Sequence, residues 1–269
     1  MTQPTVTVIV PTHLPEPDAM GKVSLAQTLS VLHRHTITFV VPIGLDVRWY
    51  EEFCRGKAQV RFERFDWQGF FEYSRLMLHP AFYRRFRSYD YVLICHLDAF
   101  VFRDELLEWC ERGYDYVGSV IYRLGWKDGV PLSPRKARVN AALRRLLRTR
   151  RTEYLANGGF ALKKVATFLR LTQRFKPWLD LYATVARLRG RGIWEDMLVN
   201  RHFPRLSRRF SLPPRAVAER FGAEFVDYDP GDLPFSGQSP GTLPFGVHGW
   251  PQFQLDYWRP VIRDHGHAV

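Results

Sequence analysis

Apolar and polar positions follow two alternating patterns through the first half of the chain. Short runs rich in β-branched and aromatic residues are typical of strands, and they cover Thr5–Val10, Ile37–Pro42, Val60–Phe65, Tyr91–Cys95 and Tyr114–Ile121. Between them, apolar residues at helical spacing predict helices over Leu25–His33, Val47–Cys54, Gly69–Leu78, Ala81–Phe86 and Leu106–Arg112. Strands that alternate with helices in this way predict βαβ units, and hence an α/β fold with a mostly parallel central sheet flanked by helices.

The second half of the chain is less regular. Helices are predicted over Val165–Phe175 and Trp178–Arg189. After Leu212 the chain is rich in Pro and Gly, which predicts short strands at best and an irregular C-terminal portion. Because no internal repeat and no interdomain linker is visible, we expect residues 1–269 to form a single domain.

The composition limits the classes of protein that remain. An apolar content of 46% supports a real core and argues against global disorder. The formal net charge of +12 favours an anionic partner, which includes nucleotides, nucleic acids, anionic lipids and acidic glycans. Three cysteines without C-x-x-C spacing argue against a disulfide framework or a zinc site. Since no signal peptide or apolar run of membrane-spanning length is present, we expect a cytoplasmic protein.

A run rich in Lys and Arg extends from Arg135 to Arg151 and has two interpretations. It is a solvated helix or loop, as charge runs usually are, or it docks on an anionic membrane surface or a charged acceptor. The second interpretation places the protein at the inner face of a membrane as a peripheral protein.

The most informative segment is the polar pair at the end of the apolar run Tyr91–Cys95. His96 and Asp98 follow this run directly, and the chain then becomes apolar again. A carboxylate at the end of a buried strand is costly to desolvate unless a cation, a hydrogen-bond donor or a ligand meets it. A turn at this point brings both side chains toward one ligand, and Mn²⁺ accepts carboxylate and imidazole together. The alternative is an ordinary helix cap or salt-bridge partner.

Three further segments carry candidate chemistry. Asn157-Gly158-Gly159 permits close approach of the backbone to a ligand, or it is an ordinary turn before the next helix. Glu195-Asp196 is predicted to begin a helix, where acidic residues are common, or to supply a general base. His248 stands between two glycines, so it is either a structural donor or a residue free to meet a ligand.

The order of these segments resembles glycosyltransferases of the GT-A fold. More specifically, the chain is similar to a bacterial family of uncharacterised glycosyltransferase-like domains of polysaccharide biosynthesis. The matching pieces span about Ser24 to Trp250 and read SLAQTLSVLHRH, RLMLHPAFYRRF, YDYVLICHLDAFVF, YLANGGFAL, WEDMLVN and FGVHGW. The resemblance implies a GT-A-like, Rossmann-like sheet with a nucleotide-binding part over about 1–125 and an acceptor-side part over about 126–269.

The resemblance also implies roles for single residues. Asp98 matches the last Asp of the D-x-D motif, which holds a divalent cation on the nucleotide diphosphate. His248 matches the late His that completes the metal shell or touches the diphosphate. Glu195 and Asp196 match the x-E-D motif, whose Asp is the general base in many inverting members. The loop after the first strand, which holds the nucleoside, and the loop that lines the donor sugar are matched by Pro11, Thr12, His13, Asn157, Gly158 and Gly159.

One position departs from the family pattern. His96 stands where the D-x-D motif has its first Asp, so only one carboxylate is left for the metal. His96 is then a ligand, a ribose-binding residue or a structural residue.

The function that the resemblance implies is a metal-dependent hexosyl transfer, with inversion, from a nucleotide diphosphate sugar. We expect UDP as the nucleotide, Mn²⁺ or Mg²⁺ as the cation, and a glycan or lipid-linked glycan acceptor in cell-surface polysaccharide assembly.

Two alternative functions stay open. The basic excess is also typical of a nucleic-acid-binding protein, although zinc, RRM and KH signatures are absent from the sequence and no specific nucleic acid is expected. His96 is the argument for a non-catalytic GT-A-like scaffold.

Overall fold

The computed structural model describes residues 3–122, 154–226 and 243–269. The described residues form one sheet of nine strands in the order β3-β2-β1-β4-β7-β6-β8-β9-β5. The strands are β1 (Val6–Pro11), β2 (Thr36–Pro42), β3 (Val60–Phe65), β4 (Tyr91–Cys95), β5 (Phe100–Val101), β6 (Tyr116–Tyr122), β7 (Ala156–Lys164), β8 (Gly222–Phe225) and β9 (Gly246–Val247). Five of its eight strand pairings are parallel, and β7 and the β5–β9 pair supply the antiparallel ones. The predicted mostly parallel α/β sheet is therefore confirmed.

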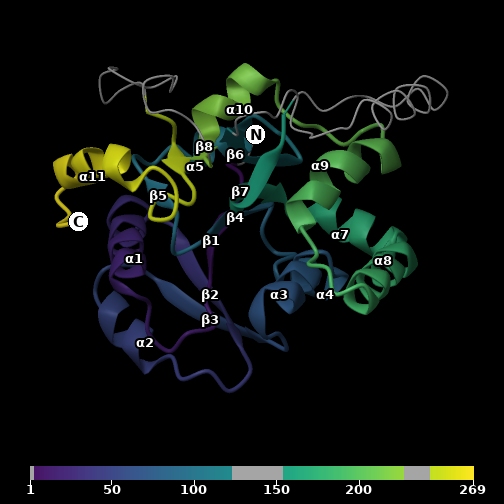
Figure 1. Cartoon of the computed structure of the whole chain (residues 1–269), viewed down its shortest axis with the longest axis horizontal. Helices are drawn as coiled ribbons and strands as arrows, with labels where there is room; N and C mark the ends of the chain where they lie inside the picture. Colours follow the sequence, from purple (N-terminus) through teal and green to yellow (C-terminus); the bar gives the residue numbers. More distant parts are fainter. Residues whose placement is uncertain (1–2, 123–153, 227–242) are drawn as a thin grey trace.

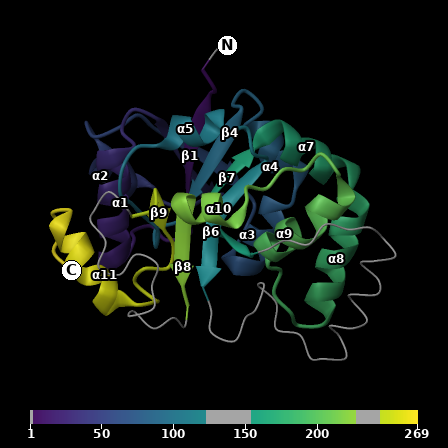
Figure 2. The same ribbon diagram turned by 90° about the horizontal axis from the view of Figure 1, so that it is seen from above.

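Helices cover both faces of this sheet (Figures 1 and 2). They are α1 (Ala19–Val31), α2 (Arg48–Cys54), α3 (Gly69–Met77), α4 (Pro80–Arg85), α5 (Leu106–Glu111), α7 (Val165–Arg174), α8 (Lys176–Leu188), α9 (Glu195–Leu206), α10 (Arg215–Phe221) and α11 (Leu255–Asp264). In Figure 1, α1 and α2 lie on one side of β1 and β2, while α3, α4 and α7 to α9 lie on the other. Among the described helices, none combines the length and apolar character that crossing a bilayer requires.

The central strands bury residues on both faces because they have helices on both sides. In β4, Val92 and Ile94 join the core cluster beneath α3, α4, α7 and α9, whereas Leu93 and Cys95 join the cluster beneath α1, α2 and α5. Continuous apolar runs are the sequence pattern that such doubly covered strands require. The carboxyl end of β4 is consequently fixed in a rigid layer.

Three sequence predictions need correction. The first helix begins at Ala19 rather than Leu25, because the Asp18 side chain accepts a hydrogen bond from the Gly21 backbone nitrogen at 2.7 Å and caps the helix. The segment after Leu212 contains the predicted short strands β8 and β9, but it also contains helices α10 and α11, which the Pro and Gly content obscured. One further prediction, for the basic run Arg135–Arg151, is neither confirmed nor corrected, because this run lies outside the described residues.

The third correction concerns Asn157-Gly158-Gly159. This segment is neither a turn nor a loop, since it lies within strand β7, which pairs with both β4 and β6. Its pairing with β6 shifts register at Gly118 and Ser119. The glycines are therefore required for side-chain room within the sheet and do not mark a break in it.

Candidate functional site

A tight turn follows β4 and carries His96 and Asp98. The Ala99 backbone nitrogen donates to the His96 carbonyl at 3.0 Å and closes the turn, while the His96 nitrogen donates to the Gly159 carbonyl of β7 at 2.8 Å. The turn breaks the alternation of a strand, so that both side chains reach one pocket. This is the arrangement expected from the sequence.

Strand pairing brings His248 to the same place. β5 and β9 pair antiparallel, with Phe100 opposite Val247, so the residues that precede Phe100 meet the residue that follows Val247. Nε2 of His248 lies 3.2 Å from Oδ1 of Asp98. The ring of His248 lies 5.6 Å from the ring of His96 between centroids.

The three side chains form a cluster that can surround one cation. One ligand atom from each of His96, Asp98 and His248 lies within 4.8 Å of the others. Within the described part of the chain, the buried atoms Asp98 Oδ1 and His248 Nε2 have no hydrogen-bond partner of good geometry. Buried polar atoms left in this way are costly, and a shared cation satisfies both. Two imidazoles and one carboxylate are a donor set of divalent transition-metal ions, and it suits Mn²⁺ better than Mg²⁺, which prefers oxygen ligands.

Each charge in this cluster shifts the pKa of the others. Burial alone would raise the pKa of Asp98, but His248 and His96 hold it well below its usual range. Burial alone would lower the pKa of His248, but Asp98 and Glu224 hold it well above its usual range. Burial lowers the pKa of His96 to about 4, so this imidazole is neutral at physiological pH.

The second nitrogen of each imidazole is held by a neighbouring side chain. Nε2 of His96 lies 2.9 Å from the hydroxyl of Tyr73, which leaves Nδ1 of His96 facing the cluster. Nδ1 of His248 lies 3.3 Å from the Glu224 carboxylate of β8, which leaves Nε2 facing Asp98. An imidazole fixed through its far nitrogen is the usual arrangement of a metal-ligating histidine.

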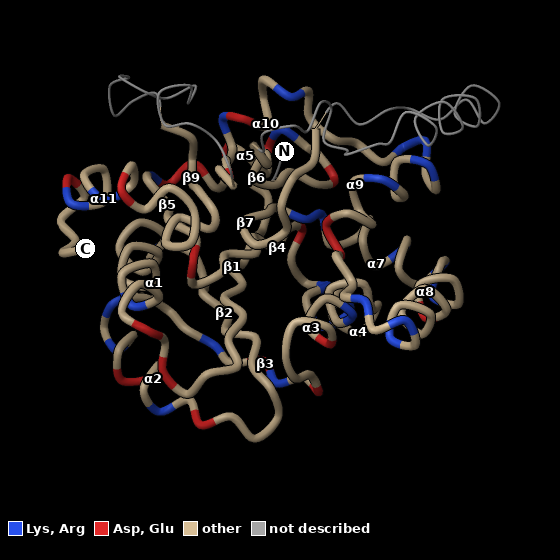
Figure 3. Tube along the Cα trace, in the orientation of Figure 1, with Lys and Arg blue, Asp and Glu red and all other residues tan. Residues whose placement is uncertain are grey.

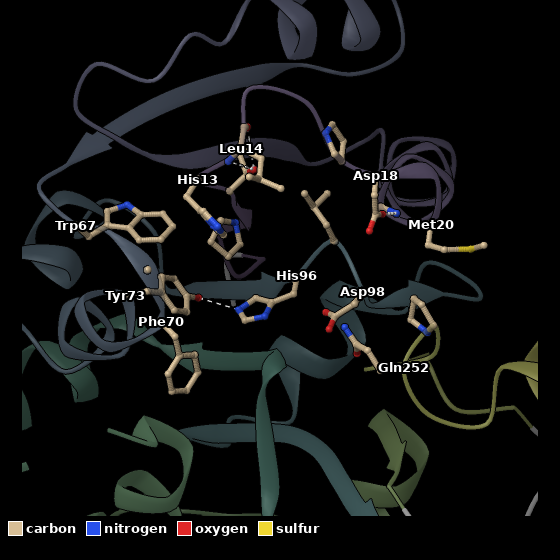
Figure 4. Close-up of a pocket in the computed structure, with 17 residues that line it drawn as sticks. His13, Leu14, Asp18, Met20, Trp67, Phe70, Tyr73, His96, Asp98 and Gln252 are labelled. Carbon is tan, nitrogen blue, oxygen red and sulfur yellow. Dashed lines mark hydrogen bonds between the residues drawn. The ribbon is translucent and has the colours of Figure 1, made fainter. Parts of the chain in front are cut away.

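An open cavity of about 590 Å³ lies beside the cluster (Figure 4). Its walls come from the loop after β1, the start of α1, the segment from β3 into α3, the turn after β4, and residues 251–252. Figure 4 shows Trp67 and Tyr73 on one side of the cavity, Asp98 on the other, and His96 between them. Such a volume fits a nucleotide, and ligands of open α/β sheets bind at the carboxyl ends of the strands.

The three residues predicted to hold the nucleoside all line this cavity. Pro11, Thr12 and His13 lie in its wall, and the His13 ring meets the Trp67 ring edge to face with centroids 5.9 Å apart. The Thr12 hydroxyl lies 2.7 Å from the hydroxyl of Tyr50 and is buried. Thr12 therefore holds the loop, and the ring of His13 is the chemically available group of the three.

The glycine pair of β7 makes room for two different groups. A Cβ at Gly159 would overlap Nε2 of His248 and approach Nδ1 of His96 to 2.8 Å. A Cβ at Gly158 would overlap the carboxylate of Glu195. The Asn157 side chain instead accepts a hydrogen bond from the Gly159 nitrogen at 2.6 Å.

Glu195 and Asp196 begin α9 as predicted, but they differ in their partners. Glu195 forms an ion pair with Lys163 of β7 at 3.1 Å, and Lys163 is fully buried. The Asp196 carboxylate accepts a hydrogen bond from the Met197 nitrogen at 2.6 Å. Burial, together with the charge of Glu195, raises the pKa of Asp196 to about 7. Asp196 is not among the residues that line the cavity.

Four residues of the site were missed from the sequence: Trp67, Tyr73, Lys163 and Glu224. Lys163 and Glu224 are charged residues within apolar strands. Since charged side chains are buried only with partners, their positions in the sequence could have indicated two buried ion pairs. Trp67 and Tyr73 gave no signal, since aromatic residues mostly fill cores in this chain.

Three solved structures that resemble the chain are transferases or synthases of glycans. Mouse xyloside xylosyltransferase 1 in its apo form has a TM-score of 0.49 and 11% identity over 91% of this chain and 98% of its own. The bifunctional glycosyltransferase WbbM in its apo form has a TM-score of 0.49 and 17% identity over 92% of this chain and 46% of its own. Core-mannan synthase A of Aspergillus fumigatus in its Mn/GDP form has a TM-score of 0.43 and 10% identity over 73% of this chain and 66% of its own.

Sequence comparison identifies one family. No curated protein matches the chain significantly. A family model described as a protein of unknown function, DUF5672, matches residues 59–248. That match runs from β3 to the last residue of the cluster and includes Glu195 and Asp196. The chain therefore belongs to the DUF5672 family of proteins of unknown function.

Proposed function

We propose that this protein is a glycosyltransferase that uses a nucleotide diphosphate sugar and a divalent cation. The observation that supports the proposal is the convergence of His96, Asp98 and His248 beside an open cavity of nucleotide size. The order of motifs in the sequence, which resembles GT-A glycosyltransferases, supports it independently.

The residues fit a divalent cation, and Mn²⁺ or Mg²⁺ is proposed. Asp98 would hold it through a carboxylate oxygen, His248 through Nε2 and His96 through Nδ1. When bound, the cation stabilises the negative charge that develops on a leaving diphosphate. Because Asp98 and Glu224 hold the pKa of His248 above its usual range, Nε2 of His248 would have to lose its proton to hold the cation, and higher pH would favour binding.

The cavity is proposed to hold the nucleotide, with UDP as the expected donor. The exposed ring of His13 offers an aromatic face for the base, while Trp67 and Tyr73 are largely buried in the cavity wall. Asp98 lies on the opposite side of the cavity, where we expect the diphosphate. Base stacking on aromatic side chains contributes about 1–3 kcal/mol per base.

Asp196 is the proposed general base, because a carboxylate with a pKa of about 7 is matched to proton transfer near neutral pH. Asp196 takes the proton of the acceptor hydroxyl while the acceptor oxygen bonds to the anomeric carbon. The bond between that carbon and the diphosphate oxygen breaks, and the nucleoside diphosphate leaves with the electron pair. Attack opposite the leaving group inverts the anomeric centre. Glu195 acts as a positioning residue, since its carboxylate is paired with Lys163.

The acceptor is proposed to be a glycan or lipid-linked glycan of cell-surface polysaccharide assembly. The net charge of +12 suits work at an anionic membrane surface, and peripheral contact with the inner face of a membrane is part of the proposal.

Calorimetric titration of UDP, with Mn²⁺ present or chelated, tests the proposal. We expect the wild type to bind UDP in the presence of Mn²⁺ at least tenfold more tightly than after chelation, and Asp98→Ala to lose this gain. Asp256→Ala is the matched control, because Asp256 on α11 is a fully exposed carboxylate. Absence of binding by UDP and by other nucleoside diphosphates under both conditions would refute the proposal. Metal-dependent binding that survives in Asp98→Ala would refute the metal site only.

A further inference from the structure

Two aromatic side chains stand exposed at the edge of the cavity. Trp194 is 58% exposed and Phe70 is 53% exposed. Their ring centroids lie 5.0 Å apart with an interplanar angle of 57°. In the described part of the chain most other large aromatic residues are buried, so this pair is an unusual feature of the surface.

The pair lies between the cavity and the start of α9, the helix that contains the proposed base Asp196. Phe70, in the first turn of α3, lines the cavity itself, and Figure 4 shows its ring at the cavity edge beside Tyr73. Trp194 is the residue before α9, so it directly precedes Glu195 and Asp196. Gly192 lies against both rings, since a Cβ there would be 3.7 Å from Phe70 and 3.8 Å from Trp194. A ligand on this pair contacts the cavity at one end and the start of α9 at the other.

We propose that Phe70 and Trp194 form a binding platform for a pyranose ring of the acceptor glycan. A pyranose has one face of C–H groups, which packs on aromatic rings, and hydroxyl groups at its edge, which stay in water. A half-exposed pair meets both requirements, because it offers apolar faces and leaves the rim of the sugar solvated. The proposal rests on the proposed function and adds where the acceptor binds.

A nucleobase is the less suitable occupant of this pair. The exposed ring of His13, which packs against Trp67, already offers a stacking face within the cavity. The Phe70–Trp194 pair lies on the side of α9, which begins with the proposed base. The geometry thus separates a donor part from an acceptor part.

Saturation-transfer NMR with simple methyl pyranosides tests the platform without an activity assay. The probes are methyl glucoside, methyl galactoside and methyl xyloside, each measured with UDP and the diamagnetic cation Mg²⁺ present. We expect transfer to the C–H face of at least one probe in the wild type, a loss of at least fivefold in Trp194→Ala, and recovery in Trp194→Phe. Leu188→Ala is the control, because Leu188 is an apolar side chain that is 83% exposed on α8.

The outcomes separate this proposal from the proposed function. Titration of UDP into the same samples reports on the donor site and on folding. Pyranoside signals that are equal in wild type and Trp194→Ala overturn the platform, and so does absence of any pyranoside signal in a wild type that binds UDP. A Trp194→Ala variant that loses UDP binding instead of pyranoside binding assigns the pair to the donor and also overturns the proposal. Failure of the wild type to bind any nucleotide refutes the proposed function instead.

Discussion

At the scale of single residues, the site depends on two glycines, because their lack of a side chain leaves room for functional groups. Gly158 and Gly159 are neighbours in β7, yet the first gives room to Glu195 and the second to His248 and His96. In a regular strand such neighbours face opposite sides of the sheet. One added methyl group therefore disturbs one group and spares the other.

We predict that Gly159→Ala abolishes metal-dependent UDP binding, whereas Gly158→Ala retains it. The Cβ at position 159 overlaps Nε2 of His248 and comes within 2.8 Å of Nδ1 of His96, so the two imidazoles must shift away from Asp98. Isothermal titration with UDP and Mn²⁺ distinguishes the two variants, and thermal unfolding confirms that both are folded. Equal binding by the two variants would contradict this account of the strand.

The Asp196 carboxylate predicts a pH dependence of both activity and stability. Its pKa of about 7 in the folded state exceeds the ordinary value of 3.8, so transfer activity should rise with pH through about 7. The protonated form is favoured in the folded state, so the associated stability is present below about pH 4 and is lost as pH rises to 7.

Asp196→Asn should thus abolish transfer and stabilise the fold at pH 8 by on the order of a few kcal/mol, with a smaller gain at pH 5. Urea unfolding at the two pH values checks this. A gain that does not change with pH would show that Asp196 ionises normally.

At the scale of elements, a buried ion pair fastens α9 to the sheet. Lys163 of β7 is fully buried, and its ammonium lies 3.1 Å from Glu195 in the first turn of α9. Such a pair gives little net stability but is costly to break, because the remaining charge stays buried without a partner.

We predict that Lys163→Met destabilises the protein by about 3–5 kcal/mol and that the double variant Lys163→Met with Glu195→Gln recovers part of this loss. Urea unfolding of both single variants and the double variant gives the coupling free energy. Losses that add without coupling would show that the two side chains do not form an ion pair.

The sequence predicted most elements because apolar periodicity reports burial, and β1, β2 and β4 are buried on both faces. It misplaced the start of α1, since the first two turns of that helix have weak periodicity and the Asp18 cap is a single residue. It missed the strand at Gly158 and Gly159, because glycine normally weakens strands and the need for room comes from residues far away in the chain. For Glu224 the sequence signals burial, because it is a charged residue in an apolar strand, but only strand pairing places it beside His248.

At the scale of the whole molecule, basic residues and exposed apolar residues meet on one side. Figure 3 shows Lys and Arg along α8 and α9. On α8, Leu181 is 63% exposed and Leu188 is 83% exposed, with Tyr182 also exposed. Apolar side chains set among cations suit a surface with anionic headgroups.

We predict that the protein sediments with anionic vesicles at low salt and less so at high salt, and that neutral vesicles do not bind it. Leu181→Ser combined with Leu188→Ser should weaken binding roughly tenfold or more, because each inserted Leu contributes about 1–2 kcal/mol. Ile43→Ser is the control, because Ile43 is an exposed apolar side chain that lies outside α8. Vesicle binding that is equal for the double Leu variant and the wild type would refute contact through α8.

The pairing of β5 with β9 has a consequence for how the protein is made. The Trp250 indole, close behind β9, donates to the Ser24 hydroxyl at 2.9 Å, and these residues are 226 positions apart. His96 and Asp98 are therefore translated long before His248, and β9, which directly precedes His248, joins the sheet late. A chain released before β9 is translated would have β1 to β4 but not the cluster. The proposed cation site therefore forms only after β9 has been translated and has joined the sheet.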